Sequence, residues 1–353
     1  MKLVVFGLSV SSSWGNGHAT IWRGLIKALH RRGHRTIFYE RDVPYYASHR
    51  DLTHGESFDL RLYGRWEEVR GAAFDELEDA DAAIITSYCT DAIEAFALAR
   101  SSDALSVFYD LDAPVTIAAL RDGKRPFYIG ADGLKGYDAV LSYTGGASLV
   151  ALRDELGARS VYPLYGSVDP GLHRKAPEID EFRADLSYLG TYAEDRQKAL
   201  SELFIKPAKR LREKRFLIGG SLYPEGFPWA DNIFFVRHVP PPAHPAFYSS
   251  SASTLNVTRG AMAAMGWCPS GRLFEAAACG THIISDTWPG LDEFFIPGEE
   301  ITIAGSADDV VEALGMDEAK RRKIAEAGRE RALKDHTAEK RAIELEGILG
   351  AYI

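Results

Sequence analysis

The chain has 353 residues, more than one hydrophobic core usually serves, so its length predicts two domains of about 150 residues each. Its composition, 46% hydrophobic and 26% charged residues, is that of a globular protein and excludes the disordered, fibrous and disulfide-built classes. A net charge of -9 argues against nonspecific binding to nucleic acid, which requires a basic surface.

The cysteines and the N-terminus indicate in which cellular compartment the protein is expected. Three cysteines, Cys89, Cys268 and Cys279, have neither disulfide nor metal-ligand spacing. The chain starts with an apolar, strand-like run instead of a signal peptide, and no apolar stretch reaches the about 20 residues that span a bilayer. We expect a cytoplasmic protein with no transmembrane segment and no cofactor.

The first half alternates short apolar runs with stretches of helical periodicity. Residues 3–8 form a first apolar run, a glycine loop follows, and helical periodicity begins at about residue 19. Consecutive strand–helix units of this kind imply right-handed crossovers and a parallel sheet. Further strands are predicted at residues 36–39, 82–86, 105–109, 139–143 and 161–165, with a helix at 91–100.

The second half repeats the same pattern after a connecting segment. Residues 166–181 contain Pro170 and Pro177, which place a domain boundary near residue 175. Strands are predicted at 186–189, 215–218, 233–236, 253–257 and 281–285, with helices at 195–213, 246–250, 270–278 and from 307 to the end.

The predicted fold class is therefore α/β, with two doubly wound, Rossmann-like domains that face each other across a cleft. We expect domains at 1–174 and 175–335, followed by a C-terminal helix at 336–353. Ligands of doubly wound sheets bind outside the carboxyl ends of the strands, so the candidate residues are sought there.

A glycine loop connects the first strand and the first helix: Trp14, Gly15, Asn16, Gly17 and His18. Glycines allow a backbone to approach a ligand closely and leave amides that can point at negative charge. A plain tight turn explains the loop equally well, and the third glycine of the dinucleotide fingerprint is missing. His18 favours a functional loop, because it can contact a phosphate or act near an acceptor.

Two carboxylates, Asp110 and Asp112, follow the strand at 105–109. A carboxylate at the end of that strand can act as the base that deprotonates an acceptor hydroxyl. For at least one of them, a turn-forming role ahead of Pro114 is the alternative. The Asp-x-Asp spacing also occurs in metal-diphosphate sites, but these belong to a single-domain architecture, so no metal is predicted here.

The segment 270–281 holds the most informative pattern. Ser270 is placed to cap a helix, Arg272 lies in its first turn, and Glu275 follows on the same face. The helix N-terminus and the guanidinium can neutralise a diphosphate, while the carboxylate accepts hydrogen bonds from ribose hydroxyls. A surface Arg–Glu pair is the alternative, but it does not explain the small residues at 276–281 that let a helix pack tightly on a sheet.

Other segments of the second half add weaker candidates. Gly220 and its neighbours follow a strand and can offer amides to the same diphosphate, and Arg237 with His238 can line a base pocket. An ordinary loop explains each of these segments equally well. His238 and His244 lack zinc spacing on a helix, so the pattern predicts no metal site.

These motifs resemble those of a known family. The segments 14–20 (WGNGHAT), 39–44, 109–114, 187–192 and 270–281 (SGRLFEAAACGT) are similar to the CgeB-like spore-maturation glycosyltransferases and, more loosely, to other GT-B glycosyltransferases. The resemblance covers nearly the whole chain. It implies that the C-terminal domain binds the donor, that the N-terminal domain binds the acceptor, that no metal is obligatory, and that the last helix returns to the first domain.

The resemblance also implies roles for individual residues. Glu275 would bind ribose, and Arg259 and Arg272 the diphosphate. The donor's phosphate or base region would meet Gly190, Thr191 and Tyr192, with Asn256 and Gly271 in the same donor-binding set. The chain departs from the family's pattern at the position seven before Glu275, where Cys268 replaces a second glutamate.

The sequence therefore predicts transfer of a hexosyl group from a UDP-, dTDP- or GDP-sugar to an unidentified acceptor. If the transfer inverts the sugar, Asp110 or Asp112 is the expected base, and His18 is the second choice. Two alternatives remain open: a non-hydrolysing sugar-nucleotide epimerase, and a catalytically silent nucleotide-binding module.

Overall fold

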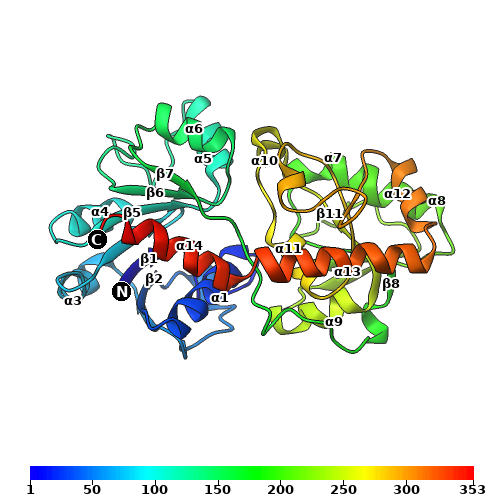
Figure 1. Cartoon of the computed structure of the whole chain (residues 1–353), viewed down its shortest axis with the longest axis horizontal. Helices are drawn as coiled ribbons and strands as arrows, with labels where there is room; N and C mark the ends of the chain where they lie inside the picture. The colour runs from blue at the N-terminus through cyan, green and yellow to red at the C-terminus, as the bar shows by residue number, and fades with distance from the viewer. The chain divides into compact units, whose positions relative to one another are not determined.

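The computed structural model describes residues 1–353 and divides them into two compact units (Figure 1). Unit 1 consists of Met1–Tyr165 and Ala338–Ile353, and unit 2 of Gly166–Thr337. The sequence suggested a division after residue 174, whereas the structure assigns residues 166–174 to unit 2. There the amide of Val168 donates to the carbonyl of His336 over 2.9 Å and so ties the two ends of the unit together.

Unit 1 is built on a seven-stranded parallel sheet with the strand order β3-β2-β1-β4-β5-β6-β7. Its central strands are buried on both faces, which explains their continuous apolar runs. The strands are β1 (Lys2–Gly7), β2 (Arg35–Arg41), β3 (Asp59–Tyr63), β4 (Ala82–Thr86), β5 (Leu105–Asp110), β6 (Ala139–Ser142) and β7 (Val161–Pro163).

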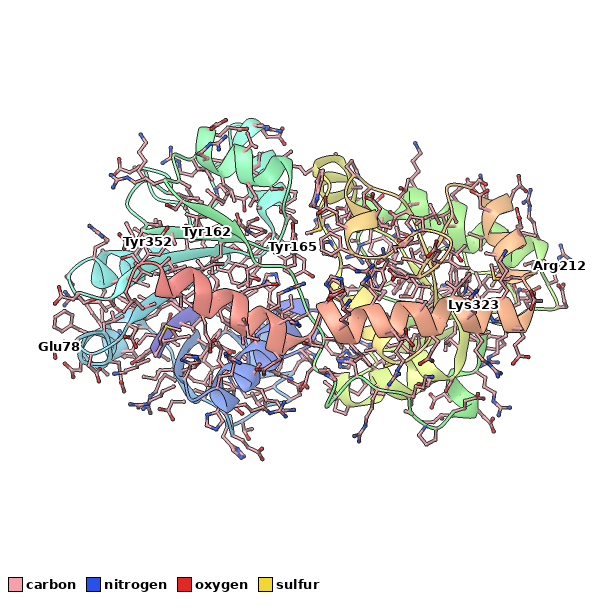
Figure 2. All side chains as sticks on the ribbon, viewed as in Figure 1. Glu78, Tyr162, Tyr165, Arg212, Lys323 and Tyr352 are labelled. Atoms are coloured by element: carbon pink, nitrogen blue, oxygen red, sulfur yellow. The ribbon has the colours of Figure 1, made fainter.

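Helices cover the sheet of unit 1, and the last helix of the chain is one of them. They are α1 (Gly17–Arg31), α2 (Pro44–Ala47), α3 (Trp66–Leu77), α4 (Ala92–Ala99), α5 (Ala113–Arg121), α6 (Ala147–Asp154) and α14 (Ala338–Gly350). The C-terminal helix α14 lies beside α1 (Figure 1) and buries Leu345 and Leu349 in the same core as Trp22. Next to this helix, the hydroxyls of Tyr162 and Tyr352 lie 3.0 Å apart (Figure 2).

Unit 2 is built on a six-stranded sheet with the order β10-β9-β8-β11-β12-β13, and all of its pairings are parallel. Aromatic residues such as Tyr188, Phe204 and Phe216 fill its core. The strands are β8 (Ala184–Leu189), β9 (Phe216–Gly220), β10 (Ile233–Arg237), β11 (Ser251–Asn256), β12 (His282–Ser285) and β13 (Thr302–Ile303).

The first helical stretch of unit 2 is interrupted. The sequence predicts one helix over 195–213, but the structure has a 3-10 turn η2 (Glu194–Arg196), α7 (Gln197–Leu200), a π-helical turn η3 (Ser201–Ile205) and α8 (Lys206–Arg210). Pro207 explains the wide turn, because proline has no amide hydrogen and its ring would collide with a carbonyl of the preceding turn in a regular α-helix.

The remaining helices of unit 2 complete the doubly wound arrangement. They are η1 (Asp180–Phe182), η4 (Pro241–Ala243), α9 (His244–Ser249), α10 (Gly260–Met265), α11 (Gly271–Ala278), η5 (Leu291–Glu293), α12 (Ala307–Leu314) and α13 (Glu318–Asp335). Helix α11 packs against α13 and β12. No helix of the chain combines the length and the apolar composition that crossing a bilayer requires.

Both sheets have the same topology. In unit 1 the strand order reverses between β1 and β4, and in unit 2 it reverses between β8 and β11. At such a switch point the two connections leave toward opposite faces of the sheet, which opens a crevice outside the carboxyl ends of the strands. The predicted α/β class with two Rossmann-like domains is confirmed. Several elements were not predicted from the sequence, because they are short or their apolar periodicity is weak: β3, β13, α2, α3, α5, α6 and α10.

Salt bridges fix α14 on unit 1. The Nε and Nη2 atoms of Arg32 each donate to a carboxylate oxygen of Glu346 over 2.6 Å, and His34 contacts the same carboxylate. Hydrogen bonding to Arg32 lowers the pKa of Glu346 from 4.5 to about 2. A carboxyl group whose pKa is lower in the folded than in the unfolded protein stabilises the fold at every pH above the unfolded pKa. This stabilisation is lost as the pH falls from about 4.5 toward about 2.

We expect Glu346→Gln to lower the melting temperature at neutral pH, and we expect the difference from wild type to shrink in acid and in high salt. Thermal unfolding across this pH range measures both effects. The matched control is Glu339→Gln, which removes a more exposed single contact to Arg32 over 2.8 Å. Equal melting temperatures of Glu346→Gln and wild type at neutral pH would contradict the role of this contact.

Candidate functional site

Four polar side chains converge at the switch point of unit 1. His18 lies in the first turn of α1, Tyr88 follows β4, and Asp110 and Asp112 end or follow β5. The Nε2 atom of His18 lies 3.5 Å from Oδ2 of Asp112, and its ring centroid lies 5.8 Å from that of Tyr88. Tyr88 has a φ of +64°, a left-handed conformation that costs energy in a non-glycine residue and is often found at functional sites.

The two carboxylates of this cluster differ in their surroundings. Asp110 is fully buried, and its Oδ1 accepts the amide of Asp112 over 3.0 Å, as the turn-forming alternative predicts. Burial raises the pKa of Asp110 to about 6, and the charge of Asp112 adds to this rise. Asp112 stands at the N-cap position of α5 without a capping side-chain bond, so its carboxylate is directed to His18 instead.

A buried carboxylate organises the loop before α1. Glu40, at the end of β2, accepts the amides of Val10 and Ser11 over 2.7 and 2.9 Å and the hydroxyl of Ser9 over 2.9 Å. The next amide, that of Ser12, donates to the hydroxyl of Ser9. The amides of residues 10 to 12 therefore already have internal acceptors, and they fix the chain that leads into the glycine loop.

The glycine-loop residues themselves have structural roles. The ring of Trp14 stacks on that of His49 with centroids 4.3 Å apart. Gly15 has a φ of +60°, which favours glycine. Asn16 is the N-cap of α1, since its side chain accepts the amide of His18 over 3.1 Å. A Cβ at Gly17 would meet no atom within 4 Å, so packing does not explain this second glycine.

In unit 2, Arg272 connects the carboxyl ends of two strands at the switch point. Its Nε donates to the carbonyl of Leu189 at the end of β8, and its Nη1 donates to Oδ1 of Asn256 at the end of β11 over 3.0 Å. The guanidinium carbon lies 5.0 Å from the ring centroid of Tyr188. Ser270 stands at the N-cap of α11 as predicted, but its hydroxyl donates to Asn256 over 2.8 Å and does not cap the helix.

Arg196 contributes a second guanidinium at the switch point of unit 2, and it was not among the residues predicted from the sequence. Its Nη1 donates to the hydroxyl of Tyr188 over 3.1 Å, while its buried Nε has no partner. Neither Arg196 nor Arg272 forms an ion pair with a carboxylate. Tyr188 therefore lies against two guanidinium groups, neither of which is within ion-pair distance of a carboxylate.

Glycines bring the loops after β8 and β9 close together. A Cβ at Gly220 would lie 2.1 Å from the carbonyl oxygen of Gly190, and a Cβ at Gly190 would lie 3.0 Å from Nη2 of Arg272. The amides of Gly190 and Tyr192 donate to the carbonyls of Gly219 and Ser221, each over 2.9 Å. These two amides are therefore engaged within the unit, while no internal hydrogen bond engages the amide of Thr191 between them.

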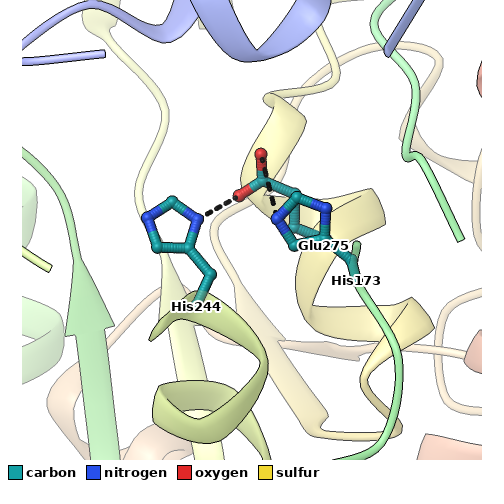
Figure 3. Close-up of side chains that lie close together, drawn as sticks. All are labelled: His173, His244 and Glu275. Carbon is teal, nitrogen blue, oxygen red and sulfur yellow. Dashed lines mark ion pairs between the residues drawn. The ribbon is translucent and has the colours of Figure 1, made fainter. Parts of the chain in front are cut away.

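Glu275 projects from α11 one turn beyond Arg272 but does not pair with it. Its two oxygens face histidines: Oε1 lies 3.9 Å from Nε2 of His173, and Oε2 lies 3.6 Å from Nδ1 of His244 (Figure 3). Burial alone would raise the pKa of Glu275, but the two histidines and Arg272 outweigh it and lower the pKa to about 2. Burial lowers the pKa of His173, which lies deeper.

Three predicted donor-site residues have no direct contact with Arg272. The Nε of Arg259 donates to Asp195 over 2.8 Å. Arg237 is exposed at the end of the edge strand β10, which β9 and β8 separate from β11. His238 has a φ of +57°, and its amide donates to the carbonyl of Gly220 over 2.7 Å. His238 therefore lies next to the glycine loop, and Arg237 pairs in register with Gly220 with its side chain exposed.

Comparison with known proteins gives a family match for part of the chain and structural matches for nearly all of it. Residues 196–347, which include Arg196, Arg272 and Glu275, match the sequence model of a family described as "Glycosyl transferase-like". Sucrose-phosphate synthase from Thermosynechococcus elongatus superimposes with a TM-score of 0.73 at 14% sequence identity, over 99% of this chain and 98% of that chain. The chain has the GT-B fold.

Two further structures with this GT-B fold contain a nucleotide. HepE of Anabaena in complex with UDP-glucose aligns with a TM-score of 0.70 at 13% identity, over 99% of this chain and 100% of that chain. An alpha-glucosyltransferase in complex with UDP and a 13-mer DNA aligns with a TM-score of 0.68 at 12% identity, over 99% of both chains. No curated protein matches the sequence significantly.

The buried Asp110 makes the stability of this GT-B chain depend on pH. Its pKa is raised from 3.8 to about 6, so the stability that its neutral form contributes is complete below pH 3.8 and is lost as the pH rises through about 6. We therefore expect Asp110→Asn to be more stable than wild type at mildly alkaline pH, with a free energy of unfolding larger by about 2–3 kcal/mol. In acid the two proteins should be equally stable.

Urea unfolding in acid and at mildly alkaline pH measures the free energies of unfolding of both proteins. Asp103→Asn, at an exposed position of the same unit, is the matched control and should behave like wild type at both. If Asp110→Asn were less stable than wild type in alkali, the ionised carboxylate would be a stabilising group, contrary to our interpretation.

Proposed function

We propose that the protein is a glycosyltransferase that moves a hexosyl group from a nucleotide diphosphate sugar to an acceptor. The observation that carries this proposal is the convergence of Arg196 and Arg272, without acidic partners, at the switch point of unit 2. Proteins pair buried charges as a rule, so two unpaired guanidiniums point to an anionic ligand. A diphosphate carries the charge and the acceptor oxygens that two guanidiniums bind.

The other polar groups of unit 2 fit the rest of a donor. The ionised Glu275 accepts ribose hydroxyls, and the amide of Thr191 contacts the phosphates beside Gly190, Tyr192 and Gly220. A uridine nucleotide is the first candidate donor, because UDP or UDP-glucose is bound in two of the similar structures, with dTDP- and GDP-sugars as alternatives. The guanidiniums neutralise the diphosphate, so transfer needs no metal at this position. Membership of the CgeB-like group rests on the sequence motifs.

Unit 1 supplies the base in this proposal. In an inverting transfer the acceptor oxygen bonds to the anomeric carbon, the bond from that carbon to the diphosphate oxygen breaks, and the acceptor proton moves to His18. The imidazole of His18 accepts the proton, and Asp112, whose Oδ2 lies 3.5 Å from Nε2, stabilises the imidazolium. Arg196 and Arg272 stabilise the departing nucleotide diphosphate.

Binding of UDP tests the donor site. We expect Arg272→Gln to raise the dissociation constant of UDP about 10- to 100-fold, since a charge-assisted hydrogen bond contributes roughly 1.5–3 kcal/mol. Glu275→Gln should also weaken UDP binding, because the amide accepts ribose hydroxyls less well than a carboxylate does.

Titration calorimetry measures both variants, and a thermal-shift panel of nucleotide sugars identifies the donor. The matched control is Arg322→Gln, which removes an exposed guanidinium paired with Glu318 on α13. Unchanged UDP binding by Arg272→Gln would remove the basis of the proposal, as would a panel in which no nucleotide sugar shifts the melting temperature.

Turnover tests the role of unit 1. We expect His18→Gln to slow the release of UDP from UDP-glucose, with water as the acceptor, by about 100-fold or more, while the dissociation constant of UDP stays unchanged. The exposed His54→Gln is the matched control. Wild-type turnover by His18→Gln would exclude this histidine as the base.

A further inference from the structure

Unsatisfied polar atoms concentrate around Glu275. Four of the eleven buried side-chain nitrogen and oxygen atoms without a hydrogen-bond partner lie there: both ring nitrogens of His173, Nδ1 of His244 and the hydroxyl of Tyr248. His173 is 1% exposed, and the side chain of Glu275 is 12% exposed. Buried polar groups are nearly always paired, so such a concentration indicates a missing bound species.

The orientation of the rings indicates the charge of that species. Nε2 of His244 lies 3.1 Å from the carbonyl oxygen of Val239, and since a carbonyl only accepts, Nε2 carries the hydrogen. The tautomer with its hydrogen on Nε2 leaves a lone pair on Nδ1, and this atom lies 3.6 Å from Oε2 of Glu275 without a hydrogen-bond partner. A cation between the two atoms gives both of them a partner.

The distances suit a metal ion. In a tetrahedral zinc site with bonds of about 2.0–2.2 Å, neighbouring ligand atoms lie roughly 3.3–3.6 Å apart. The histidine nitrogens lie 3.6 and 3.9 Å from the carboxylate oxygens, and one ligand atom from each of the three residues lies within 4.8 Å of the others. A small inward movement of the rings would complete such a site. A backbone carbonyl bound to the second ring nitrogen, as Val239 is to His244, is typical of metal-ligating histidines.

We propose that His173, His244 and Glu275 form a binding site for a divalent transition metal, with zinc as the best fit to two imidazoles and one carboxylate. The three ligands come from the segment before η1, from the start of α9 and from α11 (Figure 3). The metal ties these segments of unit 2 together. The proposal departs from the expectation of no metal, because His173 and Glu275 are distant from His244 in the sequence and local spacing does not group them.

This site is compatible with the proposed donor contact of Glu275. A carboxylate offers about four acceptor positions, so a metal at the histidine side leaves others for a ribose hydroxyl. The metal is assigned a structural role and takes no part in the transfer step. Metal binding is measured without any nucleotide, and donor binding is measured without added metal. A failure of the metal proposal therefore leaves the glycosyltransferase proposal intact, and a failure of the glycosyltransferase proposal leaves the metal proposal intact.

The experiment is a titration of the full-length, chelator-treated protein with Co²⁺ and with Zn²⁺ alone. We expect one equivalent of Co²⁺ to give the intense visible absorption of a four-coordinate site, and Zn²⁺ to displace it. We also expect Zn²⁺ to raise the melting temperature, since a ligand that binds only the folded protein stabilises it. Both measurements are independent of enzymatic activity.

Two variants and a control identify the ligands. His173→Gln and His244→Gln should each bind Co²⁺ more than about 100-fold more weakly, beyond the effect of removing an outer-shell partner. The exposed His54→Gln should bind as wild type does. A cooperative melting transition of each metal-free variant shows that the variant is folded. If a variant does not fold, the titration of wild type with Co²⁺ and Zn²⁺ decides whether the protein binds a metal. The proposal is overturned if wild type binds no metal, or if the two ligand variants bind it as tightly as wild type.

Discussion

The two reversals of strand order determine where this molecule can carry chemistry. Between β1 and β4, and again between β8 and β11, the connections leave toward opposite faces of a parallel sheet, and the carboxyl ends of the strands stay uncovered. His18 and Asp112 stand at the first reversal, and Arg272 stands at the second. Each side chain reaches its place from the residue after a strand or from the first turns of the next helix. A change of topology would therefore disperse both clusters, even if every strand were kept.

The two units hold their charged side chains differently at the switch points. In unit 1 the buried Glu40 accepts the amides of Val10 and Ser11 and so fixes the start of the loop after β1. In unit 2 Arg196 and Arg272 donate only to neutral oxygens. A buried cation without a counter-ion costs energy in the free protein, and an anionic ligand that relieves this cost binds more tightly. The same topology therefore places guanidiniums without a paired carboxylate at the switch point of unit 2, and a histidine with carboxylates at that of unit 1.

The features that could be predicted from the sequence are those that depend on residues close together in the chain, such as strands and the faces of helices. Apolar runs located most strands, and the spacing of Arg272 and Glu275 placed both on one side of α11. It did not reveal their contacts, because Arg272 bonds to Leu189, and Glu275 faces His173, about a hundred residues before it. No local pattern marks such partners, which meet only when the sheet forms. The predicted helix over 195–213 also ran through Pro207, before which the structure instead has a π-helical turn, because the effect of a proline within a helical pattern was not taken into account.

Helix α11 explains why the second cluster keeps its charges apart. At a spacing of three residues, Arg272 and Glu275 could pair on the helix surface and neutralise each other. Instead Arg272 is drawn to oxygens at the ends of β8 and β11, and Glu275 is drawn to two histidines. The small residues after Glu275, all buried, let the helix approach the sheet closely enough for both contacts. A positive and a negative group therefore stand side by side without cancelling, which suits a ligand that presents a diphosphate next to hydroxyl donors, as a nucleotide sugar does.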